Sequence, residues 1–281
     1  MVRRKACRGE LPVSLQEKIE ILVVLTEDKN QETRNAAFHT LEGWPSTELQ
    51  QVISDPATPA RVLEVVATDL APGRTELMSA LLRNPSLPGE LREWVESTAA
   101  LFREAESIES SAFSVPIEVE EEDGAAGPDA GQQKKRETLL QRINHMPAAE
   151  KIKTALTGNQ EERLILVRDA NKLVARAVLQ SPKLTSHEIE AIATMKNVTE
   201  EVLRLIAMNR KFMKTYAVVR SLVNNPRVPI DVGVPLLSRV NDRDLKWLAL
   251  NRNVADVIRR LAEKMVKQRE NANKVNLHGK H

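Results

Sequence analysis

The chain has 281 residues, of which 42% are hydrophobic, 28% are charged and only 3% are aromatic. Its 41 Lys and Arg residues against 39 Asp and Glu residues give a formal net charge of +2. The scarcity of aromatic residues, with only 10 glycines, speaks against most β architectures and favours a soluble all-α protein. The longest aliphatic run, 21–25, is far shorter than the roughly 18 residues that indicate a membrane span.

The near-neutral total conceals a strong charge difference along the chain. Residues 1–108 carry a net charge of −5, residues 109–133 carry −7 and residues 134–281 carry +14. A chain divided in this way is expected to offer its C-terminal half to an acidic partner. That partner is either another molecule or the chain's own middle segment.

The start of the chain is basic and contains the single cysteine, Cys7. One cysteine excludes an internal disulfide and a thiolate-rich metal site. The basic residues lead into Leu11 and Pro12 and then into an amphipathic segment, so the apolar stretch of a signal peptide is missing. We expect a flexible basic tail over 1–12 with an incidental exposed thiol at Cys7, and a cytoplasmic location.

Helical periodicity dominates the first part of the chain. Ser14 and Glu17 have the spacing of a capping box and precede a first helix over 14–26. Proline, glycine and asparagine separate the later segments, which predicts further helices near 31–42, 46–54, 59–70, 74–83 and 88–107. Together these segments form a predicted N-terminal repeat block, 13–108.

The periodicity fails over 109–135, where acidic and small residues predominate and cannot assemble a core. We interpret this segment as an acidic disordered linker. Beyond it, a basic C-terminal block over 136–270 and a polar tail over 271–281 are predicted. The block's helices are expected near 136–144, 148–157, 160–168, 171–180, 185–194, 199–208, 211–223, 229–239, 241–250 and 254–269.

Short helices with short connections must pack as antiparallel neighbours, which is typical of an α-solenoid. A recurring joint supports this architecture, because Asn-Pro-x-x-Pro occurs at 84–88 and 225–229 and Asp-Pro-x-x-Pro at 55–59. The first proline ends one helix, and the second suits the start of the next. Degenerate joints begin at Ser181, Lys196 and Arg252.

Comparing the chain with itself at offsets of 140 and 141 residues aligns parts of the two blocks. Residues 46–67 align with 186–207 with apolar positions mostly matched, and Leu81, Asn84, Pro85 and Pro88 meet Leu222, Asn225, Pro226 and Pro229. We infer an internal duplication. The alternative is that any two stretches of helical repeat agree by register.

The Asn-Pro-x-Val-Pro joint and the apolar positions after it resemble the leucine-rich-repeat-variant type of bacterial α-helical repeat. The two-helix spacing is similar to HEAT and armadillo arrays. The resemblance covers most of 45–90 and 170–267. It implies a scaffold with protein-binding surfaces and transfers no catalytic residue to this chain.

Motifs that carry chemistry are missing from the sequence. No two of the five histidines form a helical metal pair, and neither a phosphate-binding glycine-rich loop nor a Gly-x-Ser-x-Gly elbow occurs. We therefore predict no enzymatic activity, no cofactor and no metal. Trp44, Trp94 and Trp247 are expected to pack in repeat cores or to cover repeat edges.

The basic C-terminal block supplies the candidate binding residues. Because a solenoid stacks equivalent joints along one edge, cations at the joints can form a ridge. The alternative is an ordinary solvated surface rich in Lys and Arg. The ridge residues are Arg204, Arg210, Lys211, Lys214, Arg227, Arg243, Lys246 and Arg252.

These features predict a cytoplasmic, non-enzymatic scaffold or adaptor that binds a protein or acidic peptide through the C-terminal block. The alternative is a nucleic-acid-binding repeat protein, since phosphate contacts need little beyond spaced cations. Against that alternative, Phe212, Tyr216 and Trp247 are expected in the core, which leaves few platforms for base stacking. A third possibility is an intramolecular contact of the acidic linker with the basic block.

Overall fold

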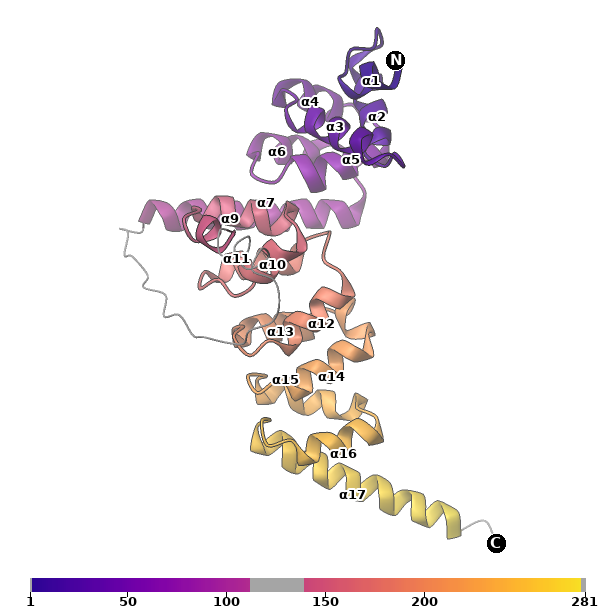
Figure 1. Cartoon of the computed structure of the whole chain (residues 1–281), viewed down its shortest axis with the longest axis vertical. Helices are drawn as coiled ribbons and strands as arrows, with labels where there is room; N and C mark the ends of the chain where they lie inside the picture. The colour runs from indigo at the N-terminus through magenta and orange to yellow at the C-terminus, as the bar shows by residue number, and fades with distance from the viewer. Residues whose placement is uncertain (1, 112–138, 279–281) are drawn as a thin grey trace. The chain divides into compact units, whose positions relative to one another are not determined.

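The computed structural model describes residues 2–111 and 139–278, and in these residues it contains helices and no strand (Figure 1). The predicted all-α class is therefore confirmed. The chain divides into two compact units, which we call unit 1 (Met1–Thr157) and unit 2 (Gly158–His281). All but the first three residues of the predicted acidic linker lie outside the described residues.

Unit 1 begins with short helices and ends with a long helix and the segment packed on it. Residues 139–144 are also helical. Its helices are α1 (Val2–Cys7), α2 (Leu15–Leu25), α3 (Gln31–Glu42), α4 (Ser46–Ile53), α5 (Ala60–Val65) with a π-helical turn at Val66–Leu70, α6 (Thr75–Arg83), α7 (Gly89–Ser111) and α9 (Ala148–Thr157).

The N-terminus differs from its prediction. A flexible tail was expected over 1–12, but α1 packs against α2 and α3. The expectation of an exposed thiol at Cys7 is wrong, because Cys7 is buried and its carbonyl oxygen accepts a hydrogen bond of 2.6 Å from the Thr40 hydroxyl. Gly9 makes the turn after α1 possible, since its φ of 66° favours glycine.

The capping box at the start of α2 is confirmed. The Ser14 hydroxyl accepts from the Glu17 backbone N–H, and the Glu17 carboxylate accepts from the Ser14 backbone N–H at 2.9 Å. These two bonds satisfy donors that the first turn of a helix otherwise leaves open.

Helix α9 belongs to the same compact unit as α7, although the sequence analysis grouped its residues with the C-terminal block. Its buried side chains are Ile152, Ala155 and Leu156, and it packs on α7. Lys153 of α9 also lies close to Gly73. The block boundaries themselves stay a prediction.

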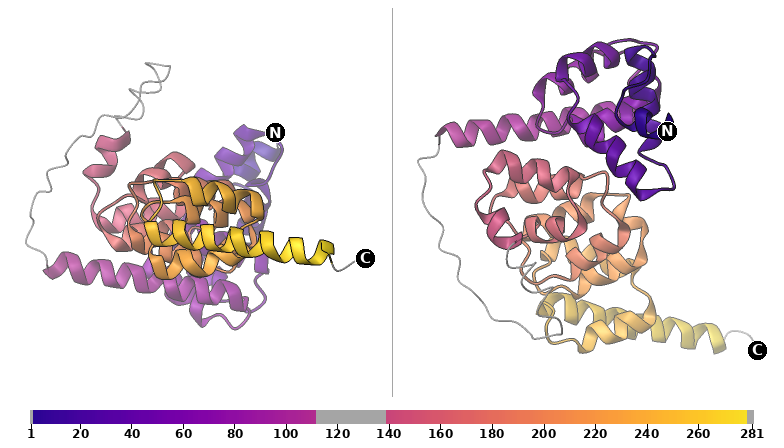
Figure 2. Two further views of the ribbon diagram at one scale, coloured as in Figure 1. Left: turned by 90° about the horizontal axis from the view of Figure 1, so that it is seen from below. Right: turned by 45° about the horizontal axis from the view of Figure 1, so that its top comes forward.

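Unit 2 alternates between two helix layers, with α12 and α14 on one side and α13 and α15 on the other (Figure 1). We call them layer A and layer B. Layer A consists of α10 (Gln160–Leu166), α12 (Ser186–Thr194), α14 (Tyr216–Asn224) and α16 (Asp242–Leu250). Layer B consists of α11 (Lys172–Gln180), α13 (Glu200–Met208), α15 (Ile230–Leu236) and α17 (Asp256–His278). The final helix, α17, lies along α16 (Figure 2).

Side-chain caps explain where many of these helices begin. The side chains that accept from first-turn backbone N–H groups belong to Asn159, Asn171, Thr185, Thr199 and Asn241. Each such bond satisfies one of the open donors at a helix start and contributes typically about 1 kcal/mol.

Two predicted helices are interrupted in unit 2. The segment predicted as one helix over 211–223 is a 3-10 turn at Phe212–Lys214 followed by α14, with an extended Thr215 between them. The segment predicted over 229–239 is α15 followed by a 3-10 turn at Leu237–Arg239. Pro235 lies inside α15 and removes a backbone donor there, which accounts for the short helix.

The predicted end of the last helix, near residue 269, is also corrected. The last helix continues through residue 278 rather than ending near 269. The segment has no glycine or proline before Gly279, and polar residues such as Gln, Lys and Glu are good helix formers. Lack of apolar periodicity was therefore a poor indicator of a helix end.

A buried ion pair ties the first helices of unit 2 together. Arg163 and Glu188 keep only 5% and 2% of their side-chain surface exposed, and Nη2 of Arg163 lies 2.6 Å from Oε1 of Glu188. Nη1 of Arg163 donates to the Gly158 carbonyl at 2.7 Å. Oε2 of Glu188 accepts from the backbone N–H and the hydroxyl of Thr185, each at 2.8 Å. Each charge is thus paired and hydrogen-bonded, as burial requires.

In the described part of the chain, no helix is long and apolar enough to cross a membrane. Among the same residues, no three His, Cys, Asp or Glu side chains gather as a metal ion would require.

Candidate functional site

The connections of unit 2 lie along two separate edges, because the chain passes alternately from one layer to the other. The first edge carries the passages from layer A to layer B, at 167–171, 195–199, 225–229 and 251–255. The second edge carries the returns, at 181–185, 209–215 and 237–241. Hydrogen bonds join neighbours within an edge: on the second, Arg239 donates to the Met213 carbonyl at 2.5 Å.

The eight cations predicted from the sequence do not form one ridge. Arg227 and Arg252 lie on the first edge, whereas Arg204 and Lys246 lie within helices. The remaining four lie at or next to the second edge, at Arg210, Lys211, Lys214 and Arg243.

At least three of the eight cations make contacts within unit 2, and one of them is Arg227, which donates to the Val198 carbonyl at 3.4 Å. Arg204 hydrogen-bonds Asp231, which raises the pKa of the arginine and lowers that of the aspartate. Lys246 lies 2.7 Å from Glu270, and this hydrogen bond raises the lysine pKa. In the described residues, no ion pair or side-chain hydrogen bond engages Arg210, Lys214, Arg243 or Arg252.

Helix α16 presents a combination that the sequence analysis missed. Trp247 and Leu250 are 67% and 75% exposed although both are large and apolar. Arg243, Lys246, Trp247 and Leu250 occupy positions i, i+3, i+4 and i+7, so they share one side of the helix. We call these four residues the α16 face. It contains two of the eight predicted cations.

The expectation that Trp247 and Tyr216 pack in the core is wrong. Leu245 and Leu248 fill the buried positions of α16, and Trp247 points away from them. Tyr216 is 39% exposed and its hydroxyl donates to Asp244 at 2.7 Å, which links α14 to α16. Burial, together with this hydrogen bond, raises the tyrosine pKa. The helical register could have predicted this exposure. Leu245 and Leu248 are three residues apart and share one side of the helix, whereas Trp247 points to another side.

The layer A helices can be aligned through the residues that end them, which are Met195, Asn225 and Asn251. Equivalent positions are those at the same distance before these residues. At the outer positions, the residue types change from α12 to α16. The equivalent sets in α12, α14 and α16 are His187, Ala217 and Arg243; Glu190, Arg220 and Lys246; Ala191, Ser221 and Trp247; Thr194, Asn224 and Leu250. The surface is polar on α12 and α14 and becomes cationic and apolar on α16.

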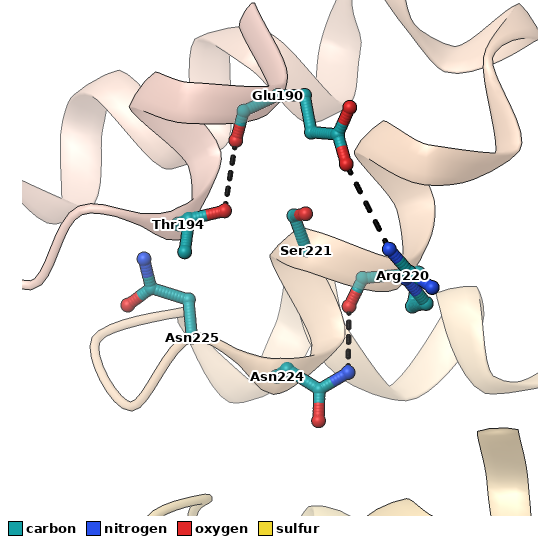
Figure 3. Close-up of a pocket in the computed structure, with 6 residues that line it drawn as sticks. All are labelled: Glu190, Thr194, Arg220, Ser221, Asn224 and Asn225. Carbon is teal, nitrogen blue, oxygen red and sulfur yellow. Dashed lines mark hydrogen bonds and ion pairs between the residues drawn. The ribbon is translucent and has the colours of Figure 1, made fainter.

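A polar pocket lies between α12 and α14 on this outer surface (Figure 3). Arg220 and Glu190 face each other across it, with Nη2 of the arginine 3.8 Å from Oε1 of the glutamate. Thr194 and Asn224 each donate to a carbonyl of their own helix, at 2.9 and 2.8 Å. The Ser221 hydroxyl points into the pocket and makes no hydrogen bond within the described residues.

Asn225 closes one side of the pocket and holds the first edge together. Its amide donates to the carbonyls of Ala193 and Met195, at 2.7 and 2.8 Å. In unit 1, Asn84 donates in the same way to Ile53 and Asp55, at 2.7 and 3.1 Å. The two donors, Asn84 and Asn225, are 141 residues apart, and the corresponding acceptors are 140 residues apart. These are the offsets found in the sequence. This equivalence supports the duplication, which stays a prediction.

The comparison with known families bears on the resemblance noted from the sequence. The model of the Leucine Rich Repeat Variant domain matches residues 47–105, from α4 into α7. The chain is a helical-repeat protein. The resemblance is thus confirmed, whereas the bacterial origin it implied stays a prediction. No curated protein and no solved structure matches the chain.

Proposed function

We propose that this helical-repeat protein is a non-enzymatic cytoplasmic scaffold or adaptor that binds an acidic protein segment through unit 2, with the α16 face as the centre of the contact. The helical-repeat fold supports a role in protein interaction. The observation that carries the proposal is the exposure of Trp247 and Leu250 beside Arg243 and Lys246.

The chemistry of the α16 face suits protein binding. Tryptophan and arginine are the residue types most enriched among those that dominate interface energetics. Burying one large apolar side chain contributes about 1.5–3 kcal/mol. Unit 2 contains 23 Lys and Arg against 13 Asp and Glu, so acidic partners are attracted and basic ones are repelled.

The test is affinity selection of random 12-residue peptides on the immobilised full-length protein. We expect the recovered peptides to combine acidic and apolar residues. Their affinities, measured by fluorescence anisotropy, should fall at least tenfold for a Trp247→Ala, Leu250→Ser double variant. Val24→Ser in unit 1 is the matched control, because Val24 is 70% exposed. The Val24→Ser control should bind the peptides as the wild type does. Peptides that bind the double variant as tightly as the wild type would contradict the proposal.

Nucleic acid is the second candidate ligand, and one observation now favours it. Few aromatic platforms for base stacking were expected on the surface from the sequence, yet Trp247 is exposed. Stacking on an aromatic ring is worth about 1–3 kcal/mol per base. Binding of a single-stranded 20-nucleotide DNA that weakens steeply between 50 and 200 mM salt, with no competition from the peptides, would favour this candidate.

The acidic middle segment could also occupy the basic surface intramolecularly, and we retain this as part of the proposal. Its support is charge complementarity alone, because Glu118 and 120–123 are acidic while unit 2 is basic. Deletion of 115–131 is expected to raise the affinity of the full-length protein for acidic peptides. An unchanged affinity would exclude the intramolecular contact.

A further inference from the structure

We infer the form of the segment that binds, an inference that rests on the proposed function. The geometry points to an extended segment of a partner protein that carries an apolar side chain and, four residues away, a carboxylate. The apolar side chain packs on Trp247 and Leu250. The carboxylate pairs with Arg220 in the pocket between α12 and α14.

Arg220 is the cation that lines the pocket, and its guanidinium can accept a carboxylate there. Its side chain is 50% exposed, and its contact with Glu190 is 3.8 Å, longer than a hydrogen bond. The guanidinium therefore keeps donors available, and a guanidinium can bind a carboxylate with two parallel hydrogen bonds. Lys246 occupies the equivalent position on α16 but is engaged by Glu270 at 2.7 Å.

The pocket also favours an extended backbone over a helix. An extended segment brings unpaired N–H and C=O groups that need partners, whereas a helix satisfies its own. The pocket offers the Ser221 hydroxyl, and it offers the oxygen of Thr194 as an acceptor. Each is a small polar group of the kind that can pair with a peptide group.

The spacing of four residues follows from the packing of the helices. Neighbouring helices are about 8–10 Å apart, so the distance from α16 to the middle of the α12–α14 pair is about 12–15 Å. Four residues of an extended chain span about 13 Å. Side chains four apart also point to the same side of an extended segment, whereas side chains three or five apart point to opposite sides.

The experiment uses the full-length protein and three libraries of 12-residue peptides. Leu is fixed at position 4, and Glu is fixed three, four or five residues later, with the other positions random. We expect the library with a spacing of four to yield at least tenfold more enrichment than the other two. Equal enrichment from the three libraries would overturn the inference.

A double-mutant cycle tests the carboxylate contact directly. The best peptide and its Glu→Gln version are titrated against the wild type and against Arg220→Gln. We expect Arg220→Gln to weaken the Glu peptide at least fivefold and the Gln peptide less than twofold. Arg103→Gln is the control, because Arg103 is an exposed arginine of α7 whose Nε donates to the Ala99 carbonyl. Equal weakening of both peptides by Arg220→Gln would overturn the inference.

The two proposals fail in different ways. If binding depends on Trp247 but shows neither the spacing preference nor the coupling to Arg220, the inference is wrong and the proposed function stands. If binding does not depend on Trp247, both are wrong.

Discussion

At the scale of single residues, the most demanding contact is the buried pair of Arg163 and Glu188. Burial alone would raise the pKa of the Glu188 carboxyl, but hydrogen bonds from Thr185 and Arg163 outweigh it and hold the pKa below its ordinary value of 4.5. Removing one partner of such a pair typically costs about 3–5 kcal/mol, because the other charge stays buried and unpaired. Replacing both partners with apolar residues avoids that cost.

We therefore expect Arg163→Met to destabilise unit 2 by about 3–5 kcal/mol, and Arg163→Met with Glu188→Leu to recover most of the loss. Lys267→Gln is the control, since its pair with Glu263 is exposed and such pairs contribute about 1 kcal/mol or less. Urea unfolding followed by circular dichroism gives the free energies. A double variant as unstable as Arg163→Met would show that the pair is not the cause.

The same pair predicts a pH dependence. Because the folded pKa of Glu188 is lowered, its contribution to stability is fully present above pH 4.5 and is lost as the pH falls through the folded pKa. Glu188→Gln should therefore cost most stability above pH 4.5, and its stability should fall less steeply than that of the wild type as the pH drops below 4.5. Parallel pH profiles for the two proteins would contradict this assignment.

The third prediction at this scale concerns Gly9. Its φ is positive, and a Cβ built there would lie 2.7 Å from the Trp44 ring. Gly9→Ala should loosen α1, because a positive φ alone costs an L-residue roughly 1–2 kcal/mol. Hydrogen exchange over residues 2–10 measures the effect. Gly89→Ala is the matched control, because no atom lies within 4 Å of the added methyl group. Equal exchange in the two variants would contradict the account.

At the scale of elements, the asparagines of the joints act as clamps between successive connections. Asn225 and Asn84 are both buried, and each donates to one carbonyl at the end of a preceding helix and to one in the joint after that helix. We expect Asn225→Ala and Asn84→Ala to cost about 1–3 kcal/mol each, since two acceptors lose their donor. Asn253→Ala is the control, because that side chain is exposed. Thermal unfolding with no difference between the buried and exposed positions would exclude the clamp.

Element boundaries were predictable where a cap or a proline marks them. Ser14 and Glu17 give the start of α2, and the Pro-x-x-Pro joints give the ends of α4, α6 and α14. The break before α14 has no such marker, because Thr215 is compatible with a helix start or with an extended residue. The exposure of Trp247 was missed because its position was judged by residue type and not by register.

At the scale of the whole molecule, the partition into units depends on the packing of α9 on α7, two helices that lie on either side of the middle segment in the sequence. Periodicity alone places a boundary near residue 108, because the apolar pattern stops there. The compact unit nevertheless includes α9, whose Ile152 and Leu156 are fully buried. Contacts between segments that are distant in sequence cannot be derived from a local pattern.

This arrangement predicts how unit 1 tolerates truncation. A fragment of residues 1–157 should be more stable than a fragment of 1–111, because burying each large side chain of α9 contributes about 1.5–3 kcal/mol. Thermal unfolding of the two fragments compares them, and Ile152→Ala in the longer one should give an intermediate stability. Equal stability of the two fragments would show that α9 contributes nothing to unit 1.

The charge difference along the chain remains the most informative feature of the sequence, and the structure changes how it is interpreted. Some of the cations of unit 2 pair with carboxylates on neighbouring helices. Arg204 pairs with Asp231, and Arg176 pairs with Glu201. Four of the predicted cations have no such partner in the described residues, and of these Arg243 lies on the same side of α16 as an exposed tryptophan. The binding surface is therefore expected on the outside of layer A and not along the joints.

The measurement that tests this most directly is hydrogen–deuterium exchange of the full-length protein with and without a saturating acidic peptide recovered by selection. Our account predicts slower exchange in α16 and α14, no change in unit 1, and loss of the effect in the Trp247→Ala, Leu250→Ser variant. Protection confined to the joints at 225–229 and 251–255, or to unit 1, would contradict it.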